Sequence, residues 1–247
     1  MQAFMRNMIP YTVKSGETLF MIANRFGVDI EQLRTVNPHI NEYNIIAGQL
    51  IGIPSKQETL SLKPIPVNLI ILDLNNTFRM LWEQHIVWTR IVISDITSDM
   101  AELNFAVARL LRNPGDFGEQ MAKYYGYDFG RKFAALMHDH LSIAAELVQT
   151  AKRGDNQKFD ELNRQWFKNA DDMARVLASV NPYWDFKAWQ KMFYEHLNLV
   201  LKEATQFLNN QLEANVLLFD QMERQALEMA DTMTKGIINQ FPYQFCK

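Results

Sequence analysis

The N-terminal part of the chain is defined by residues 11–54, which read YTVKSGETLFMIANRFGVDIEQLRTVNPHINEYNIIAGQLIGIP. A short β-type run at 11–13 is followed by Lys14-Ser15-Gly16, which is a turn signal. Thr18 then provides a helix N-cap, and Gly27 marks the end of a helix whose apolar residues recur at helical spacing. This stretch therefore begins with a strand and a helix.

A second helix and a second strand complete the pattern. The helix is predicted from about Asp29 to Val36, and Asn37-Pro38 ends it because a residue before proline avoids the helical conformation. Leu50 to Ile53 supplies the closing strand. The sequence thus predicts a small α+β module of order βααβ, in which the strands pair antiparallel and the helices cover one face.

The same segment resembles the LysM family along its whole length. The residues that carry the resemblance are Tyr11-Thr12-Val13, Ser15-Gly16-Glu17-Thr18-Leu19, Ile22-Ala23, Phe26-Gly27-Val28, Leu33, Asn37-Pro38, Ile45 and Gly48-Gln49-Leu50-Ile51-Gly52-Ile53-Pro54. The resemblance implies a shallow groove between the loop after the first strand and the loop before the last. It also implies that this groove binds the N-acetyl groups of peptidoglycan, chitin or another N-acetylglucosamine polymer.

The resemblance also implies which residues line this glycan-binding groove. One lip is formed by Gly16, Glu17, Thr18 and Leu19, and the other by Pro38, Asn44, Ile45 and Ile46. A neutral glycan needs backbone donors and acceptors for its amides and small apolar surfaces for its sugar faces. The alternative for single residues stays open, since Thr18 can serve only as a cap and Leu19 only as a packing residue.

Composition restricts the remaining partners. The chain has 25 basic and 28 acidic residues and a formal charge of -3, so it offers no net attraction for nucleic acid. No run of about 18 apolar residues is present, and we expect no membrane insertion. Cys246 is the only cysteine, which excludes an intrachain disulfide. Partner expectations are therefore a glycan and, beyond it, a second copy of the chain or a spore-coat protein.

The start of the chain bears on where the protein acts. Its first residues, MQAFMRNMIPYTV, hold no apolar run of signal-peptide length. We therefore expect synthesis in the cytoplasm without a signal peptide, although the glycan lies outside the membrane. Deposition by the mother cell onto a forespore resolves this conflict, as do lysis, phage particles or non-classical export. The expected location is the spore envelope or the cell wall.

The rest of the chain is predicted to be helical. Residues 1–10 form a lead-in and 55–74 a semi-rigid linker with two prolines, after which 75–247 form an all-α helical bundle. Breaks at Asn113-Pro114, Gly126, Gly154-Asp155 and Asn181-Pro182 separate its helices. We predict helices at 75–97, 99–111, 114–125, 127–153, 156–179, 185–211 and 213–240.

An internal repeat is predicted within this bundle. Asp139-His140-Leu141 matches Glu195-His196-Leu197, and Ala170-Asp171 matches Ala230-Asp231. Two helical hairpins therefore look related by duplication. A looser match pairs Trp82 and His85 with Trp166 and Asn169.

The repeat places polar groups at similar heights in the bundle. His140 with Asp171 and His196 with Asp231 can face one interior, and His85 can approach from the first helix. Histidines and carboxylates on facing helices are a common metal-ligand set, which suits zinc, iron or manganese. The alternative is that these pairs are structural contacts that fix the register of the hairpins. A transition metal is accordingly the only cofactor considered, and none is required.

Residues from about Leu81 to Phe241 also resemble an uncharacterised family of bacterial helical-bundle proteins found in spore-formers. The segments that carry this resemblance are Leu81-Trp82-Glu83-Gln84-His85, Leu110-Leu111-Arg112-Asn113-Pro114, Asn169-Ala170-Asp171, Tyr194-Glu195-His196-Leu197 and Ala230-Asp231. The family implies fold and context but no activity.

Three functions compete for the whole chain. The favoured one is a glycan-binding protein in which the LysM module tethers the bundle to a spore or wall envelope. The alternative is a metal-binding bundle, with redox or storage work, delivered to the envelope by the same module. A wall hydrolase is the third, but no cysteine-histidine or paired-carboxylate cleft stands out, so we favour a protein without enzyme activity.

Overall fold

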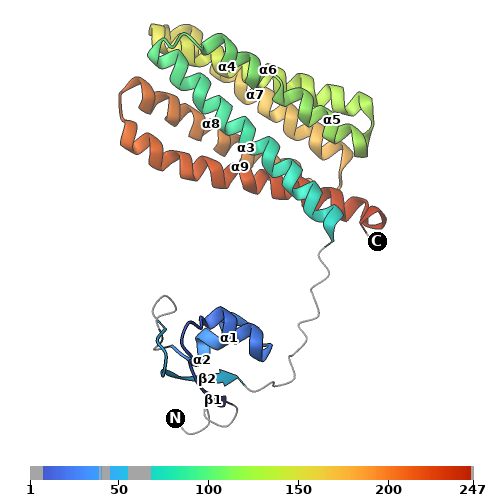
Figure 1. Cartoon of the computed structure of the whole chain (residues 1–247). Helices are drawn as coiled ribbons and strands as arrows, with labels where there is room; N and C mark the ends of the chain where they lie inside the picture. The colour runs from blue at the N-terminus through green and yellow to red at the C-terminus, as the bar shows by residue number, and fades with distance from the viewer. Residues whose placement is uncertain (1–7, 39, 41–44, 55–67, 246–247) are drawn as a thin grey trace. The chain divides into compact units, whose positions relative to one another are not determined.

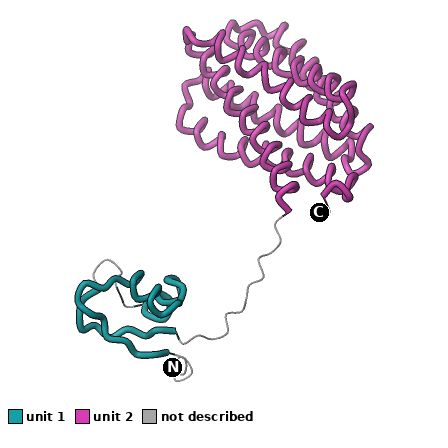
Figure 2. Tube along the Cα trace, turned by 45° about the vertical axis from the view of Figure 1, so that its right-hand side comes forward, with its two compact units in different colours: residues 1–66 teal, residues 67–247 magenta. Residues whose placement is uncertain are grey.

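The computed structural model describes residues 8–38, 40, 45–54 and 68–245. The chain divides into two compact units, which we call the N-terminal unit (residues 1–66) and the helical unit (residues 67–247) (Figure 2). Each has its own hydrophobic core. The two units are therefore described separately.

The N-terminal unit has the predicted order of two strands and two helices (Figure 1). Its elements are β1 (Met8–Thr12), α1 (Leu19–Phe26), α2 (Ile30–Val36) and β2 (Leu50–Pro54). The strands pair antiparallel, with Tyr11 opposite Ile51. Thr18 and Asp29 cap the two helices, and Gly27 ends α1 with φ of 63°. Strand β1 begins before the predicted Tyr11, because the residues preceding it also pair with β2.

The core of the N-terminal unit is small. It joins the inner faces of both helices and of β2, and consists of Val13, Leu19, Ile22, Ala23, Leu33, Ile51 and Ile53. A buried amide supplements it: Asn37 donates to the carbonyls of Leu33 and Gly52 and accepts from the Gly52 amide, each at 2.7 Å. Since Asn37 follows α2 directly, these bonds fasten the end of α2 to strand β2.

The helical unit is built from long α-helices packed side by side (Figure 1). Its helices in the described residues are α3 (Leu69–Ser98), α4 (Leu103–Leu110), α5 (Asn113–Tyr125), α6 (Tyr127–Arg153), α7 (Asn156–Val180), α8 (Phe186–Leu208) and α9 (Leu212–Gln240), followed by the 3-10 turn η1 (Pro242–Gln244). The helical part of the chain is thus all-α, as predicted.

Helix α3 begins earlier than the sequence analysis expects. The prediction assigns residues up to 74 to the linker, whereas α3 begins at Leu69. The side chain of Asn68 accepts hydrogen bonds from the amides of Ile70 and Ile71, which caps the first turn. Capping therefore allows the apolar run after Asn68 to extend the helix by more than one turn.

The order of packing closes the helical unit into a ring. Helix α3 packs against α4, the helices from α5 to α9 each pack against the next, and α3 also packs against α9, the last α-helix. Helix α3 further contacts α6 and α8. Helices α5 and α6 approach most closely at Gly118 and Gly130, where a Cβ on either residue would overlap the backbone of the other. The packing thus brings α3, α6 and α8 toward a common interior.

Large aromatic side chains fill this interior. Trp82, Trp166, Trp184 and Trp189 are each no more than 2% exposed. Among the described residues, no helix is long and apolar enough to cross a membrane. An extensive set of apolar side chains from these helices is buried in one core.

Candidate functional site

The helical unit contains a cluster of three buried histidines, one on each of three helices. His85 of α3, His140 of α6 and His196 of α8 are at most 2% exposed. Their ring centroids lie 5.4 to 6.2 Å apart. One ring nitrogen of each histidine lies within 4.8 Å of the corresponding nitrogens of the other two. We call this group the histidine cluster.

Each histidine of the cluster contacts a side-chain amide further along the chain. The distance from Nδ1 to the amide oxygen is 3.2 Å in all three pairs, and the partners are 28 or 29 residues apart. The pairs are His85 with Asn113, His140 with Asn169, and His196 with Gln225. The amides lie on α5, α7 and α9, so three hairpins, formed by α3 with α5, α6 with α7 and α8 with α9, each contribute one histidine and one amide.

The direction of each amide decides which ring nitrogen carries hydrogen. Every amide nitrogen donates to the backbone carbonyl one turn before its histidine, at 2.9 to 3.0 Å. The amide oxygen therefore faces the ring, where it can only accept a hydrogen bond. Nδ1 must then be the donor. This leaves the lone pair on Nε2, the ring nitrogen that the amide does not contact.

Burial keeps these imidazoles neutral. Desolvation lowers the pKa of His140 to about 3 and the pKa of His196 to about 4. Desolvation, followed by repulsion from the other two rings, holds the pKa of His85 well below its usual value. Nε2 of His196 is buried without a hydrogen-bond partner among the described residues. The three histidines are therefore neutral acceptors in a buried interior.

The two aspartates predicted to join these histidines are held elsewhere. Asp171 accepts from Gln190 at 2.7 Å and from the Tyr194 hydroxyl at 3.0 Å. Asp231 forms a two-pronged ion pair with Arg79, at 2.7 and 2.8 Å. Among the described residues, the cluster of closely spaced ligand atoms holds His85, His140 and His196 without either aspartate. The carboxylates thus connect neighbouring helices instead of facing the cluster.

The three amides are the residues that the sequence analysis missed. The sequence feature that could have revealed them is the near-constant separation between each histidine and its amide. Each amide also donates to a backbone carbonyl that lies 32 or 33 residues earlier in the chain. The looser repeat match of the sequence analysis aligned His85 with Asn169, whereas in the structure Asn169 is the amide partner of His140 and the partner of His85 is Asn113. A search for polar side chains 28 or 29 residues after each histidine would therefore have found the three amides.

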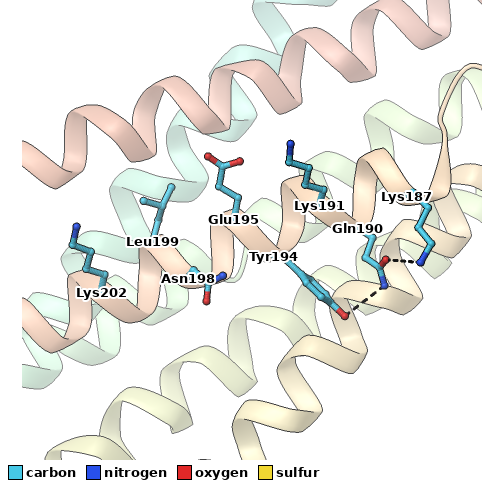
Figure 3. A pocket seen from close by; sticks show the side chains of 8 residues that line it. All are labelled: Lys187, Gln190, Lys191, Tyr194, Glu195, Asn198, Leu199 and Lys202. Carbon is cyan, nitrogen blue, oxygen red and sulfur yellow. Dashed lines mark hydrogen bonds between the residues drawn. The ribbon is translucent and has the colours of Figure 1, made fainter.

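A surface groove runs along helix α8 next to Asp171. Lys187 donates to Gln190 at 3.1 Å, and Gln190 contacts the Tyr194 hydroxyl at 3.5 Å (Figure 3). The residues that line it are Lys187, Gln190, Lys191, Tyr194, Glu195, Asn198, Leu199 and Lys202. Figure 3 shows these side chains spread along one helix without converging on a point. The groove lacks the arrangement of a binding site.

In the N-terminal unit, two loops meet beside the sheet. The amide of Val13 donates to the carbonyl of Gln49, and the amide of Gly48 donates to the carbonyl of Val13, both at 2.9 Å. These bonds hold the loop after β1 against the loop before β2. Gly16 and Gly48 turn the two loops with φ of 80° and 87°, values that side chains rarely allow. The loop after β1 and the loop before β2 are therefore joined at Val13.

Comparison with known families identifies this unit. Residues 11–54 match the LysM domain. No curated protein matches the chain, and no solved structure matches it. LysM domains bind glycans such as peptidoglycan and chitin, so the match supports glycan binding in general.

The predicted lip residues of the LysM domain differ in exposure. Gly16, Thr18 and Pro38 are exposed, and Ile46 is 61% exposed. Ile45 is half-buried against the core of the domain. Asn44 lies outside the described residues. The outward-facing candidates are therefore drawn from both loops.

Two predicted lip residues point into the LysM domain. Leu19 is 3% exposed and belongs to the core. Glu17 is buried, accepts from the Lys14 amide at 2.9 Å and the Tyr11 hydroxyl at 2.8 Å, and pairs with Arg25. The Lys14 amide, and then Tyr11 and Arg25, keep the pKa of Glu17 low against the opposing effect of burial. Both side chains are thus used within the domain, where they stabilise the loop.

Proposed function

We propose that this protein binds an N-acetylglucosamine polymer through its LysM domain and so tethers the helical unit to the envelope. The observation that carries the proposal is the family match over residues 11–54. The adjoining loops support it, because they offer backbone groups and the exposed Ile46 side by side. Such a surface suits a neutral glycan, whose amides seek hydrogen bonds while its sugar faces seek small apolar contacts.

The lip side chains proposed to contact the glycan are the exposed ones. Thr18 and Ile46 would lie against the sugar faces, and Gly16 would let the backbone approach an N-acetyl group closely. A Cβ at Gly16 would meet no atom within 4 Å, so the surrounding space is open. Glu17 acts indirectly in this proposal, by holding the loop that carries Gly16 and Thr18.

The proposed place of action is the spore or cell-wall envelope, where peptidoglycan is available to a LysM domain. A fluorescent fusion expressed in a sporulating host tests the finer part of this proposal. Fluorescence around the forespore supports deposition on the spore. Uniform fluorescence with none on spores or walls contradicts the location but leaves glycan binding to be measured separately.

Glycan binding is tested by co-sedimentation with insoluble peptidoglycan and with chitin. We expect the full chain to sediment and a chain lacking residues 1–66 to remain in solution, since the helical unit has its own core. Removal of an exposed apolar contact in Ile46→Ala should weaken binding roughly fivefold, which corresponds to about 1 kcal/mol.

Ile9→Ala is the matched control for Ile46→Ala. Ile9 is 50% exposed on β1, where it pairs with Ile53 at the end of the sheet remote from the loops. It should therefore leave glycan affinity unchanged. A full chain that stays in the supernatant with both polymers overturns the proposed function.

A further inference from the structure

We propose that His85, His140 and His196 bind one late first-row transition-metal ion, Zn²⁺ or Cu⁺, through their Nε2 atoms. The three rings converge from α3, α6 and α8, and one nitrogen of each lies within 4.8 Å of the other two. Such an ion would join helices from all three hairpins at the centre of the helical unit. This inference is independent of glycan binding.

The hydrogen bonds around the cluster prepare its nitrogens for a metal. A metal-binding histidine ordinarily donates its second ring N–H to a carbonyl or carboxylate, which fixes the tautomer and the ring orientation. Each histidine here donates Nδ1–H to an amide oxygen at 3.2 Å. Each amide is fixed in turn by a backbone carbonyl. The same orienting arrangement therefore occurs three times around one point.

The Nε2 lone pairs of the histidine cluster favour a bound cation. Three Nε2 acceptors that face each other repel, and none can donate to another while Nδ1 carries the hydrogen. Water can donate to only two of three acceptors, whereas a cation can accept all three lone pairs. Nε2 of His196, buried and without a hydrogen-bond partner in the described part of the chain, is the nitrogen most in need of one.

Bond lengths allow an ion at this place. Zinc–nitrogen bonds of about 2.0–2.1 Å in tetrahedral or trigonal geometry put the nitrogens roughly 3.3–3.6 Å apart. From the upper bound of 4.8 Å, the nitrogens need to approach one another by about 1.2–1.5 Å, which rotations of the three side chains can supply. Three protein ligands leave a further position for water or a small exogenous ligand.

The donor set selects the class of metal. Imidazole nitrogen suits zinc and copper, whereas magnesium, calcium and manganese prefer oxygen ligands. Asp171 and Asp231 are occupied by hydrogen bonds and an ion pair with other residues. The manganese considered from the sequence therefore loses the carboxylates that favoured it. Neutral ligands in an apolar interior are compatible with Cu⁺ in particular, because its single charge costs less to bury.

Metal binding is tested on the full chain after chelation in denaturant and refolding. Refolding is needed because the cluster is buried and an ion enters most readily before the helices close. Separate samples receive Zn²⁺, Cu⁺ with a reductant, or no metal. We expect one ion per chain by elemental analysis and a higher thermal midpoint in at least one metal sample. A folded chain that retains neither ion overturns the proposal.

Variants locate the site. His196→Gln should abolish stoichiometric binding, while His138→Gln is the matched control because that histidine lies on the same unit with an exposed side chain. Binding that survives in His196→Gln overturns the assignment. If that variant fails to fold, X-ray absorption of the metal-loaded parent decides, and fewer than three histidine ligands contradict the proposal.

The amides are tested as positioning residues. Asn169→Leu should weaken metal affinity about 10–100-fold, the usual cost of losing a residue that orients a metal ligand. Asn169→Gln should restore most of the affinity, because Gln225 already occupies the equivalent place beside His196. A purely structural amide would instead change the melting temperature of the metal-free chain and leave metal affinity alone, which would refute this role.

Discussion

The two units of this chain use buried polar groups in opposite ways. In the small LysM domain, Glu17 and Asn37 join neighbouring segments and supplement a core of few apolar residues. In the large helical unit, the buried histidines lie inside an extensive apolar core. Polar groups thus compensate for a small core in the first unit. In the second they are placed at the centre of a large apolar core.

This difference indicates where function resides in each unit. In the LysM domain, buried polar groups fix the geometry of the loops, and the binding surface that we propose is the outer face of those loops. Burying three imidazoles costs free energy unless they gain partners. A helical unit that needed only stability would place apolar side chains at these positions. The histidine cluster is therefore the part of the bundle that calls for a functional explanation.

A single methyl group added at Gly236 should disturb the packing of the helical unit. In Gly236→Ala, the added Cβ would overlap the indole of Trp184, whose Nε1 donates to the carbonyl of Thr232 at 3.2 Å. We expect a loss of unfolding free energy at or above the roughly 1–3 kcal/mol of ordinary overpacking, measured by denaturant unfolding. Gly115→Ala is the control, since a Cβ there meets no atom within 4 Å.

Glycan co-sedimentation of Gly236→Ala then sharpens the comparison of the two units. Because the LysM domain has a separate core, its binding should not change while the helical unit is destabilised. Equal stability of Gly236→Ala and Gly115→Ala would contradict the tight packing of α9 against Trp184. A parallel loss of glycan binding would contradict the independence of the units.

The polar fastening of the LysM domain is tested by Asn37→Ala. This variant removes the bonds to Leu33 and Gly52, and leaves buried backbone groups without partners at a cost of about 2 kcal/mol. Faster hydrogen exchange of the amides in β2 of the full chain is the expected result. The exposed Asn24→Ala is the control. Unchanged exchange in Asn37→Ala would show that the apolar core alone holds β2.

Local patterns in the sequence predict most of the fold. The bounds predicted for α6 agree with the structure, because the helix begins directly after Gly126 and ends directly before Gly154. The start of α3 is less visible, since a single asparagine caps an apolar run that equally suits a docked linker. The internal repeat stays a prediction, and the threefold recurrence of the histidine–amide contact supports it.

The candidate sites are less predictable than the fold, because they depend on the direction of side chains. Sequence position puts Glu17 beside Gly16 in a loop, but Tyr11 and Arg25 draw its carboxylate inward. Similarly, Asp231 lies on the same helix as Gln225, but its carboxylate forms an ion pair with Arg79 of α3 and does not face the histidine cluster. Partners that lie far along the chain decide such cases, and no local pattern reports them.

The smallest expected effect concerns Glu203, the buried carboxyl that pairs with Arg90 at 2.6 Å in the helical unit. Desolvation raises the pKa of Glu203 to about 7 against the opposing effect of Arg90, so the folded chain holds this proton more tightly than the unfolded chain. The contribution of the protonated Glu203 side chain to the free energy of unfolding is therefore fully present below its ordinary pKa near 4.5. This contribution is lost as the pH rises through about 7. Glu203→Gln, which stays neutral, should lose less stability than the parent between pH 5 and 8 in denaturant unfolding, whereas the exposed Glu228→Gln should follow the parent. A parent that becomes more stable relative to Glu203→Gln as the pH rises would mean that the ion pair with Arg90 outweighs burial, and the helical unit would then use this polar group as the LysM domain uses Glu17.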